Sequence, residues 1–451
     1  MVLARRLDER TWALNRQGRA PFVVSAAGHE GAQVGAAFAL ERGVDWALPY
    51  YRDLGLVLGL GMTPEEILLG VFSKATDPSS GGRQMPSHWS HPDLNILSQG
   101  SVIATQFPQA AGIAYELQQT GRPGIVIATG GEGATSEGDF HEGMNFAGLK
   151  KLPVVFLIQN NLYSISVPSD EQISGDLTER ATGYGIPAVS VDGNQILDVY
   201  EAVKAAADRA REGGGPTFVE ALTYRYYAHT SDDDDKQYRS PSEVEEWRKR
   251  DPIGVLRQYL IESRLLEEGA EEAIDEEAAE LVAEAVERAS AAPDASDAFS
   301  MVYAAPIENT DPSSEPEPAP DGEEVNLVTA VNRALMDIME AHPESRIFGE
   351  DVADPKGGVF RATVGLTDAH GTGRSFNTPI AESSIAGIAI GMAAAGGRPI
   401  AEIQFADFIH PAWNQIVSEA ARLHYRSAGG WTCPMVIRSP YGGGIHGALY
   451  H

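Results

Sequence analysis

The chain has 451 residues and an apolar fraction of 43%, which fits a soluble globular protein of two or three domains. Its formal net charge of −30 argues against nucleic acid or an anionic membrane as a partner, because an acidic surface repels phosphate groups. The single cysteine, Cys433, excludes an intramolecular disulfide framework and a Cys-based zinc site, so we expect a cytoplasmic protein.

Two apolar runs in the first part of the chain, residues 124–130 and 153–159, are predicted to be buried strands. Between them, residues 136–151 space their apolar side chains as a helix does, with Ser136 as a candidate cap. Together they predict a βαβ unit with parallel strands and a right-handed crossover. The same alternation of strand-like and amphipathic segments through residues 1–230 predicts an α/β architecture.

The remaining chain divides by composition. From about residue 241 it is rich in Ala, Glu and Leu, which predicts a helical acidic tail that completes a first module, 1–304. Residues 305–324 hold five prolines, many acids and no aromatic residue, so we expect an interdomain linker. Residues 325–451 form a second α/β module, which we expect to be incomplete because a domain of this class needs more strands. Its first helix has an apolar stripe made of Leu327, Val331, Leu335, Ile338 and Met339.

Two polar residues follow the predicted strands, Glu132 after the first and Asn161 after the second. The carboxyl ends of parallel strands meet at the edge where open α/β sheets bind ligands. A carboxylate and an amide oxygen there suit Mg²⁺, and the flanking glycines let backbone approach a phosphate. The glycine spacing does not fit a dinucleotide fold, and no Walker A loop is present. A helix start beside a buried asparagine remains the alternative.

Longer stretches carry a family resemblance. One long segment resembles the thiamine-diphosphate motif of 2-oxoacid dehydrogenase E1 α subunits, namely GEGATSEGDFHEGMNFAGLKKLPVVFLIQNNLYSIS. Two further segments resemble the α subunit of the branched-chain type, GRQMPSHW (82–89) and TYRYYAHTSDDDDKQYRS (223–240). Two later segments resemble the matching β subunit, FNTPIAESSIAGIAIGMA and AEIQFADFIHPAWNQI. The resemblance implies two thiamine-diphosphate-binding α/β modules, each of which is a parallel sheet flanked by helices. The chain would then be a fusion of an α subunit and a β subunit, joined by the acidic, Pro-rich linker.

This resemblance assigns a cofactor site to the first module. Mg²⁺ would be bound by Glu132, Asn161 and the backbone carbonyl of Tyr163. The diphosphate and the rest of the cofactor would contact Tyr51, Arg52, Ser101, Ile103, Gly131, Glu132, Gly133, Ala134, Asn161, Tyr163, His229, Glu382 and Phe408. Thr105 and Gln106 match a structural potassium site. Gln159 is a departure, since the animal branched-chain enzyme has an arginine there.

The catalytic residues implied by the resemblance come from both modules. His229 matches the α-subunit active-site histidine and His451 the β-subunit one. Glu382 matches the glutamate that acts on the cofactor's pyrimidine, and its apolar neighbours favour a carboxyl that holds a proton. Without the resemblance, an acid at a helix N-terminus is the simpler interpretation of Glu382. Phe408 would lie near the pyrimidine.

The function implied is the E1 component of a branched-chain 2-oxoacid dehydrogenase complex. It would decarboxylate 2-oxo acids and acylate the lipoyl group of an E2 acyltransferase. In the family the cofactor bridges α and β parts, so a fused chain should form a homodimer that mimics α2β2. A pyruvate or acetoin dehydrogenase E1, and a catalytically incomplete fragment, remain the alternatives.

Overall fold

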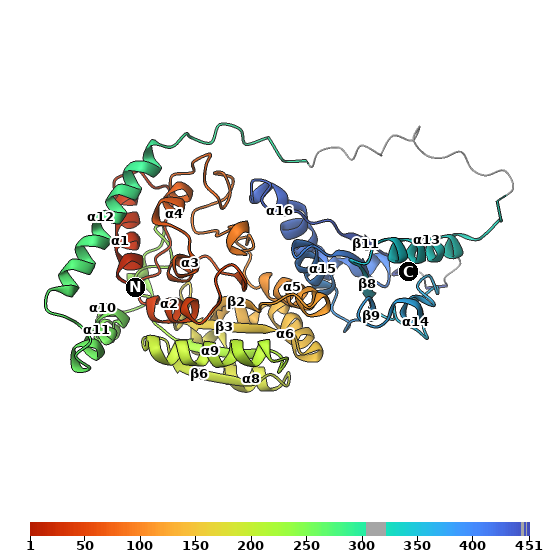
Figure 1. The fold of residues 1–451 in the computed structure, drawn as a ribbon, viewed down its shortest axis with the longest axis horizontal. Helices are drawn as coiled ribbons and strands as arrows, with labels where there is room; N and C mark the ends of the chain where they lie inside the picture. The colour runs from red at the N-terminus through yellow and green to blue at the C-terminus, as the bar shows by residue number, and fades with distance from the viewer. Residues whose placement is uncertain (304–321, 443–445, 448) are drawn as a thin grey trace.

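A computed structural model describes residues 1–303, 322–442, 446–447 and 449–451. Two α/β modules lie side by side in it (Figure 1). The predicted linker, 305–324, lies outside the described residues except for its last three. In the described part, no helix is long and apolar enough to cross a membrane.

The sheet of the first module has five parallel strands, and its centre is formed by the two predicted ones. Its order is β1 (Trp46–Leu48), β2 (Val126–Gly131), β3 (Val154–Asn160), β7 (Thr217–Leu222) and β6 (Ala188–Asp192). The strands predicted at 124–130 and 153–159 are confirmed as β2 and β3, each shifted by one or two residues. Their carboxyl ends therefore share one edge of the sheet.

Both faces of this sheet are covered, and its apolar strands alternate between them. Val154, Phe156 and Ile158 belong to the core beneath α5 (Gln106–Thr120) and α6 (Gly138–Lys150). Val155 and Leu157 belong to the opposite core, beneath α9 (Ile196–Arg211), α1 (Val2–Arg16) and α12 (Ala270–Ala291). The predicted apolar face of α6 is confirmed, since Phe140, Met144 and Ala147 are buried.

The start of α6 differs from the prediction. Ser136 does not cap the helix, because residues Glu132–Ser136 form a short 3-10 turn and α6 begins at Gly138. The hydroxyl of Ser136 donates to the carbonyl of Gln172 instead, at 3.3 Å. The tight turn keeps the backbone after β2 close to the strand ends, where the predicted ligands lie.

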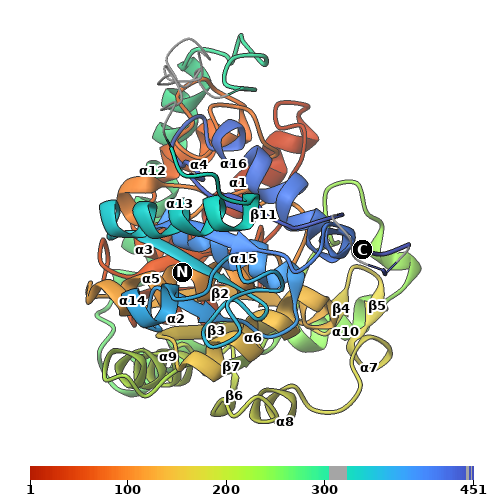
Figure 2. The same cartoon turned by 90° about the vertical axis from the view of Figure 1, so that its right-hand side faces the viewer.

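The predicted acidic tail is helical. α10 (Pro241–Arg248) and α11 (Pro252–Glu262) each begin with a proline after a side-chain cap, Ser240 and Asp251 respectively. α12 then packs along α1 and α4 (Pro64–Val71) on the outside of the first module. The remaining elements are α2 (Glu30–Phe38), α3 (Leu54–Leu60), α7 (Ser169–Gln172), α8 (Leu177–Thr182), and the hairpin β4 (Tyr163–Ser164) and β5 (Val167–Pro168). This hairpin and α7 project to one side in Figure 2.

The second module has a four-stranded parallel sheet in the order β11 (Val436–Arg438), β10 (Arg398–Glu402), β8 (Ser345–Gly349) and β9 (Ser375–Asn377). Its helices are α13 (Leu327–Ala341), α14 (Leu366–His370), α15 (Glu382–Ala394) and α16 (Ala421–Arg426). The predicted stripe of α13 is partly wrong. Leu335 and Met339 are buried and Val331 packs against the same small core, but Leu327 is 80% and Ile338 40% exposed, so the covered face is narrower than predicted.

The two modules are joined by the packing of α5 against α15, which lie next to each other in Figure 1. The helices approach closely enough to require glycine at two positions. A Cβ atom on Gly112 would lie 2.1 Å from the carbonyl oxygen of Ile388, and one on Gly391 would lie 1.9 Å from that of Gln109. A buried ion pair between Arg346 and Glu116, at 2.8 Å, also crosses the junction. One apolar core therefore runs through both modules.

Candidate active site

Glu132 and Asn161 meet at the carboxyl edge of the first sheet, as predicted. Glu132 is 1% exposed, and its carboxylate accepts the main-chain N–H of Asn161 at 3.1 Å and the hydroxyl of Ser164 at 3.2 Å. Burial raises the pKa of Glu132, and these two hydrogen bonds only partly offset that effect. A buried carboxylate without a cationic partner is costly, so the position favours a bound cation.

Asn161 connects this carboxylate to the hairpin that follows. Its side-chain oxygen accepts the N–H of Tyr163 at 3.2 Å, and its amide nitrogen lies 3.3 Å from Nε2 of the fully buried His29. Burial and the charges of Arg52 and Arg225 hold the pKa of His29 well below its ordinary value, so this imidazole is neutral and can accept. The carbonyl of Tyr163 accepts from Arg225 at 3.4 Å, and its role as a metal ligand stays a prediction.

The glycines around Glu132 leave room beside the strand end. A Cβ atom on Gly131 would meet only a ring carbon of Tyr50, at 3.9 Å. A Cβ atom on Gly133 would lie 2.4 Å from the hydroxyl of Ser164, so only glycine fits there. Ala134 is buried in the same turn. The backbone of this turn can therefore approach a phosphate group, as predicted for the segment.

Tyr51, Arg52 and His229 come together opposite this turn. Arg52 is 1% exposed, and one of its terminal nitrogens donates to the carbonyl of Ser25 at 2.5 Å. The other lies 3.4 Å from Nδ1 of His229. The ring of Tyr51 stands edge-on to the imidazole, with centroids 6.0 Å apart. The structure thus groups three residues that the sequence assigned to one ligand.

The electrostatics of this group favour an anion. Among the described residues, neither Arg52 nor Arg225 has a carboxylate within ion-pair distance, although each is 1% exposed. Burial, and then the charge of Arg52, lower the pKa of Arg225 to about 10. Burial and both arginines lower the pKa of His229 to about 4. Two buried guanidinium groups without a counter-charge are stabilised when an anion binds between them.

Two polar atoms beside this group support the same conclusion. Within the described ranges, Nε of Arg52 and the buried hydroxyl of Tyr50 have no hydrogen-bond partner. Buried polar groups are usually paired, so unpaired donors next to an open glycine turn mark a place for a ligand with acceptor oxygens. A diphosphate has such oxygens.

Gln159 does not face this site. Its amide nitrogen donates to Asp53 at 2.6 Å, and its oxygen accepts from Gln33 at 3.0 Å. All three side chains are completely buried. The amide N–H and the amide oxygen of Gln159 are thus both hydrogen-bonded to side chains inside the first module.

Ser101 and Ile103 lie in the loop that precedes α5. The hydroxyl of Ser101 is 2.6 Å from Nε2 of His88, and Ile103 packs against the main core. Thr105 donates to the carbonyl of Val102 at 3.2 Å, and the amide nitrogen of Gln106 donates to that of Thr129 at 2.8 Å. The potassium site assigned to Thr105 and Gln106 stays a prediction.

The residues assigned to the second module form a separate group. Glu382 is the first residue of α15 and is half-buried. Phe408 packs edge-on against Phe405 and His451, with ring centroids 5.5 and 5.7 Å away. Burial raises the pKa of the nearby Glu350 to about 7, and the charge of Glu382 adds to this effect. Phe408 and His451 are thus neighbours, and their roles at the pyrimidine and in catalysis stay predictions.

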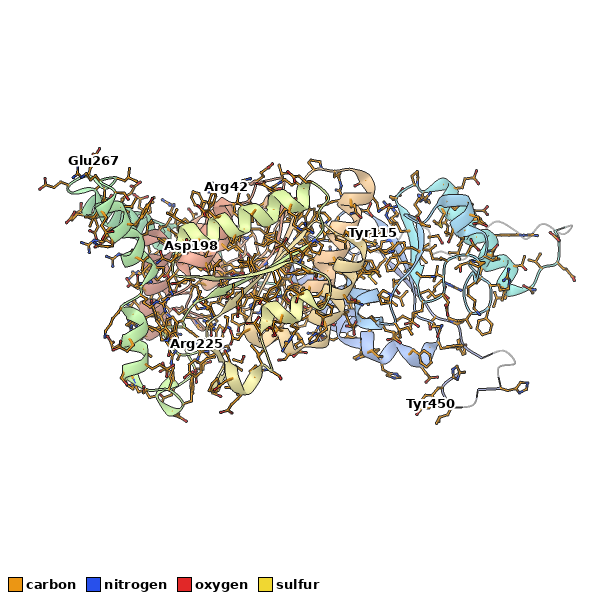
Figure 3. The ribbon with its side chains drawn as sticks, turned by 90° about the horizontal axis from the view of Figure 1, so that it is seen from below. Arg42, Tyr115, Asp198, Arg225, Glu267 and Tyr450 are labelled. Carbon is orange, nitrogen blue, oxygen red and sulfur yellow. The ribbon has the colours of Figure 1, made fainter. Side chains whose placement is uncertain are left out.

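No hydrogen bond, ion pair or ring contact in the described part of the chain joins Glu382, Phe408 or His451 to the group around Glu132 and Arg52. In Figure 3, Arg225 lies in the first module and Tyr450, the neighbour of His451, lies well away from it in the second. The start of α15 nevertheless contacts α6, the helix that follows the Glu132 turn, because Ser383 donates to Asp139 and the N–H of Ser384 donates to Glu142 at 2.8 Å. We call the residues around Glu132 and Arg52 the first, or diphosphate, half-site, and Glu382, Phe408 and His451 the second half-site.

Sequence reasoning missed several residues of the first half-site. These are His29, His88, Ser164, Arg225 and the pair Gln33–Asp53. A signal existed for three of them, since Ser164, His88 and Arg225 lie inside quoted segments, namely the one that ends in LYSIS, GRQMPSHW and TYRYYAHTSDDDDKQYRS. The others lie outside the quoted segments, and their positions depend on the folded chain.

Comparisons with known proteins agree with both modules. Residues 1–297 match the family described as "Dehydrogenase E1 component", and residues 323–451 match "Transketolase, pyrimidine binding domain". The α subunit of 2-oxoisovalerate dehydrogenase from Bacillus subtilis is 49% identical over 307 residues, which cover 67% of this chain and 93% of that protein.

Two relatives with lower sequence identity are named for different substrates. The α subunit of the pyruvate dehydrogenase E1 component from Staphylococcus aureus is 41% identical over 280 residues, covering 62% of this chain and 73% of that protein. The mitochondrial 2-oxoisovalerate dehydrogenase α subunit of Mus musculus is 40% identical over 307 residues, which cover 67% of this chain and 69% of that protein. The family match covers well over half of the chain. This chain therefore belongs to the dehydrogenase E1 component family and continues into a transketolase-type pyrimidine-binding domain.

Proposed function

We propose that the protein is the E1 component of a branched-chain 2-oxoacid dehydrogenase complex that uses thiamine diphosphate and Mg²⁺. The observation that carries the proposal is the pair of buried arginines, Arg52 and Arg225, which have no ion-pair partner in the described chain, in the same module as the buried carboxylate of Glu132. A metal-bound diphosphate supplies both the anion and the cation that these groups lack.

The residues present fit the cofactor. Glu132 and the amide oxygen of Asn161 are the hard oxygen ligands that Mg²⁺ prefers, with the Tyr163 carbonyl as a third. Arg52 and His229 would bind the diphosphate, and Tyr51 would cover it. The turn with Gly131, Gly133 and Ala134 would admit the phosphate oxygens, and Ser101 and Ile103 would contact the pyrimidine side. Potassium at Thr105 and Gln106 belongs to the same proposal.

Bound thiamine diphosphate supplies a carbon nucleophile and an electron sink for decarboxylation. The chain's own residues position it and handle protons. The Glu382 carboxyl would hold a proton at the pyrimidine ring nitrogen, with Phe408 beside the ring. His229 and His451 would orient the substrate carboxylate and move protons through their imidazole nitrogens. The pKa of His229 is lowered to about 4, so its imidazole is neutral at physiological pH and can accept a hydrogen bond.

We infer that the complete site forms between two copies of the chain. The half-site with Glu382 and Phe408 is flanked by large exposed apolar residues, Ile380 at 84% and Trp413 at 58%. Such side chains near a charged site are typical of a surface that is buried on association. In a homodimer that mimics α2β2, this surface of one copy would close over the diphosphate half-site of the other.

The partners proposed from the family are a 2-oxo acid and the lipoyl group of an E2 acyltransferase. The proposed location is the cytoplasm, as expected from the single cysteine. The module boundaries 1–304 and 325–451 also remain proposals.

The branched-chain assignment is supported by the higher identity to the B. subtilis 2-oxoisovalerate dehydrogenase subunit than to the S. aureus pyruvate dehydrogenase subunit. It is tested with an artificial electron acceptor, by comparing kcat/KM for 3-methyl-2-oxobutanoate and for pyruvate. A higher value for the branched substrate supports the proposal, and a higher value for pyruvate replaces it with a pyruvate dehydrogenase E1. Cofactor binding without turnover would make this chain a catalytically incomplete fragment.

A further inference from the structure

The turn that presents Tyr51 and Arg52 is held by side chains from three other segments. The N–H of Tyr50 donates to Asp53 and to the hydroxyl of Thr129, each at 3.0 Å. Gln33, on α2, donates to the carbonyl of Arg52 at 2.9 Å and accepts the N–H of Gly55 at 2.8 Å. Asp53 and Gln33 thus fix the backbone on both sides of Arg52.

Gln159 connects these two supports. From the end of β3 it donates to Asp53 at 2.6 Å and accepts from Gln33 at 3.0 Å. All three side chains are 0% exposed, so no water replaces a lost partner. The same strand leads two residues later to Asn161, on the metal side of the half-site.

The chemistry of these contacts specifies an amide at position 159. The residue must donate to a carboxylate and accept from an amide N–H at the same time. A glutamate offers two acceptors, and an arginine or lysine only donors. Among side chains of this length, only glutamine has one donor and one acceptor group on a single plane.

We propose that Gln159 is a positioning residue for the diphosphate, and that it acts through Asp53 and Gln33 to aim Arg52. The inference rests on the proposed function, because it needs a diphosphate at Arg52. Without Gln159, the buried carboxylate of Asp53 loses a donor, and the turn around Arg52 loses the link between its two supports.

The test measures binding of inorganic pyrophosphate with Mg²⁺, and of thiamine diphosphate, to the full chain by calorimetry. Gln159→Met should weaken both by about tenfold or more, since a buried hydrogen bond to the Asp53 carboxyl group is lost. At saturating thiamine diphosphate, kcat should return towards that of the unmodified chain, so that the loss lies in the cofactor's KM. Gln109→Met is the matched control. Gln109 is equally buried and bonds to Gln415 at 3.1 Å, away from the turn.

An exchange of the two partners tests the direction of the hydrogen bond. Asp53→Asn and Gln159→Glu should each weaken pyrophosphate binding, because each leaves two like groups face to face. The double variant restores one donor and one acceptor with the total charge unchanged, and its affinity should return to within about threefold of the unmodified chain. This comparison remains informative if Gln159→Met does not fold.

The outcomes separate the two proposals. If the unmodified chain binds no pyrophosphate, both this inference and the proposed function are overturned. If it binds, and Gln159→Met binds equally well or the double variant recovers nothing, only the inference is overturned. If Gln109→Met loses as much affinity for pyrophosphate as Gln159→Met does, the loss reflects general destabilisation of the fold, and the inference is also overturned.

Discussion

The main-chain N–H of Asn161 donates to the carboxylate of Glu132 across the ends of two adjacent parallel strands. This contact links the two residues that the sequence assigned to one metal ion. It also leaves Glu132 buried with no ion-pair partner among the described residues, and burial raises its pKa although hydrogen bonds and the charge of Arg225 oppose this effect. The position is thus unfavourable for an isolated carboxylate and suitable for one that binds a cation.

The change Glu132→Gln should therefore have opposite effects on stability and on binding. Without ligand, the melting temperature should stay equal or rise, because a buried charge is replaced by a neutral group of the same shape. The affinity for Mg²⁺-pyrophosphate should fall by about a hundredfold, since the anionic ligand is lost. Calorimetry and thermal unfolding check both effects. A lower melting temperature with unchanged binding would contradict the assignment.

The second prediction concerns Arg52. Arg52→Met should weaken pyrophosphate binding by about ten- to a hundredfold, as expected for the loss of a charge-assisted hydrogen bond. Arg52→Lys should recover only part of this loss, because an ammonium group cannot form the planar two-pronged contact. Arg19→Met, which changes an exposed arginine of the same module, is the control and should bind normally. Full recovery by lysine would show that charge alone is needed.

Diphosphate binding should also change the protonation of His229. Its pKa is about 4 because of burial and two arginines, and an anion placed among them raises it towards the ordinary value. At pH 6 the free imidazole is neutral, so binding should take up protons. Calorimetry in two buffers with different ionisation enthalpies measures this uptake. The unmodified chain should take up more protons than His229→Asn, and equal uptake would place the anion elsewhere.

The fourth prediction concerns stability rather than binding. Burial raises the pKa of Asp8 from 3.8 to about 7, although Ser25 and the N–H of Ala26 donate to it. The unfolded chain ionises at lower pH, so the free energy of unfolding should fall as the pH rises from about 4 through about 7. Asp8→Asn removes this contribution.

The melting temperature of Asp8→Asn should therefore decrease less between pH 5 and pH 8 than that of the unmodified chain. The exposed residue Asp93, changed to asparagine, is the control and should leave the pH dependence as it is. Parallel curves for all three proteins would mean that Asp8 ionises normally.

The sequence was sufficient for the parts of the fold that depend on local pattern. The apolar runs that became β2 and β3 are fully buried on both faces, so their strand character needed no tertiary information. Parallel neighbours then brought Glu132 and Asn161 together by topology alone. The resemblance correctly grouped Tyr51 with Arg52 and His229, which are far apart in the chain.

Contacts between separate loops could not be predicted in the same way. The bridge from Gln159 to Asp53 and Gln33 joins three segments, and no spacing in the sequence relates them. The stripe of α13 was overestimated because apolar spacing does not say how much of a helix will be covered. The contact of the start of α15 with α6 likewise depends on how α15 packs on the first module.

The most direct test of the account mixes two inactive variants. Glu132→Gln disables the half-site that binds the metal, and Glu382→Gln disables the half-site that acts on the pyrimidine. If each complete site combines both half-sites from different copies, mixed dimers contain one intact site, and an equal mixture should recover about a quarter of the unmodified activity. The measurement is decarboxylation of 3-methyl-2-oxobutanoate with an artificial acceptor after the two variants have exchanged subunits. Activity no higher than that of either variant alone, while the unmodified chain is active, would contradict a site shared between copies.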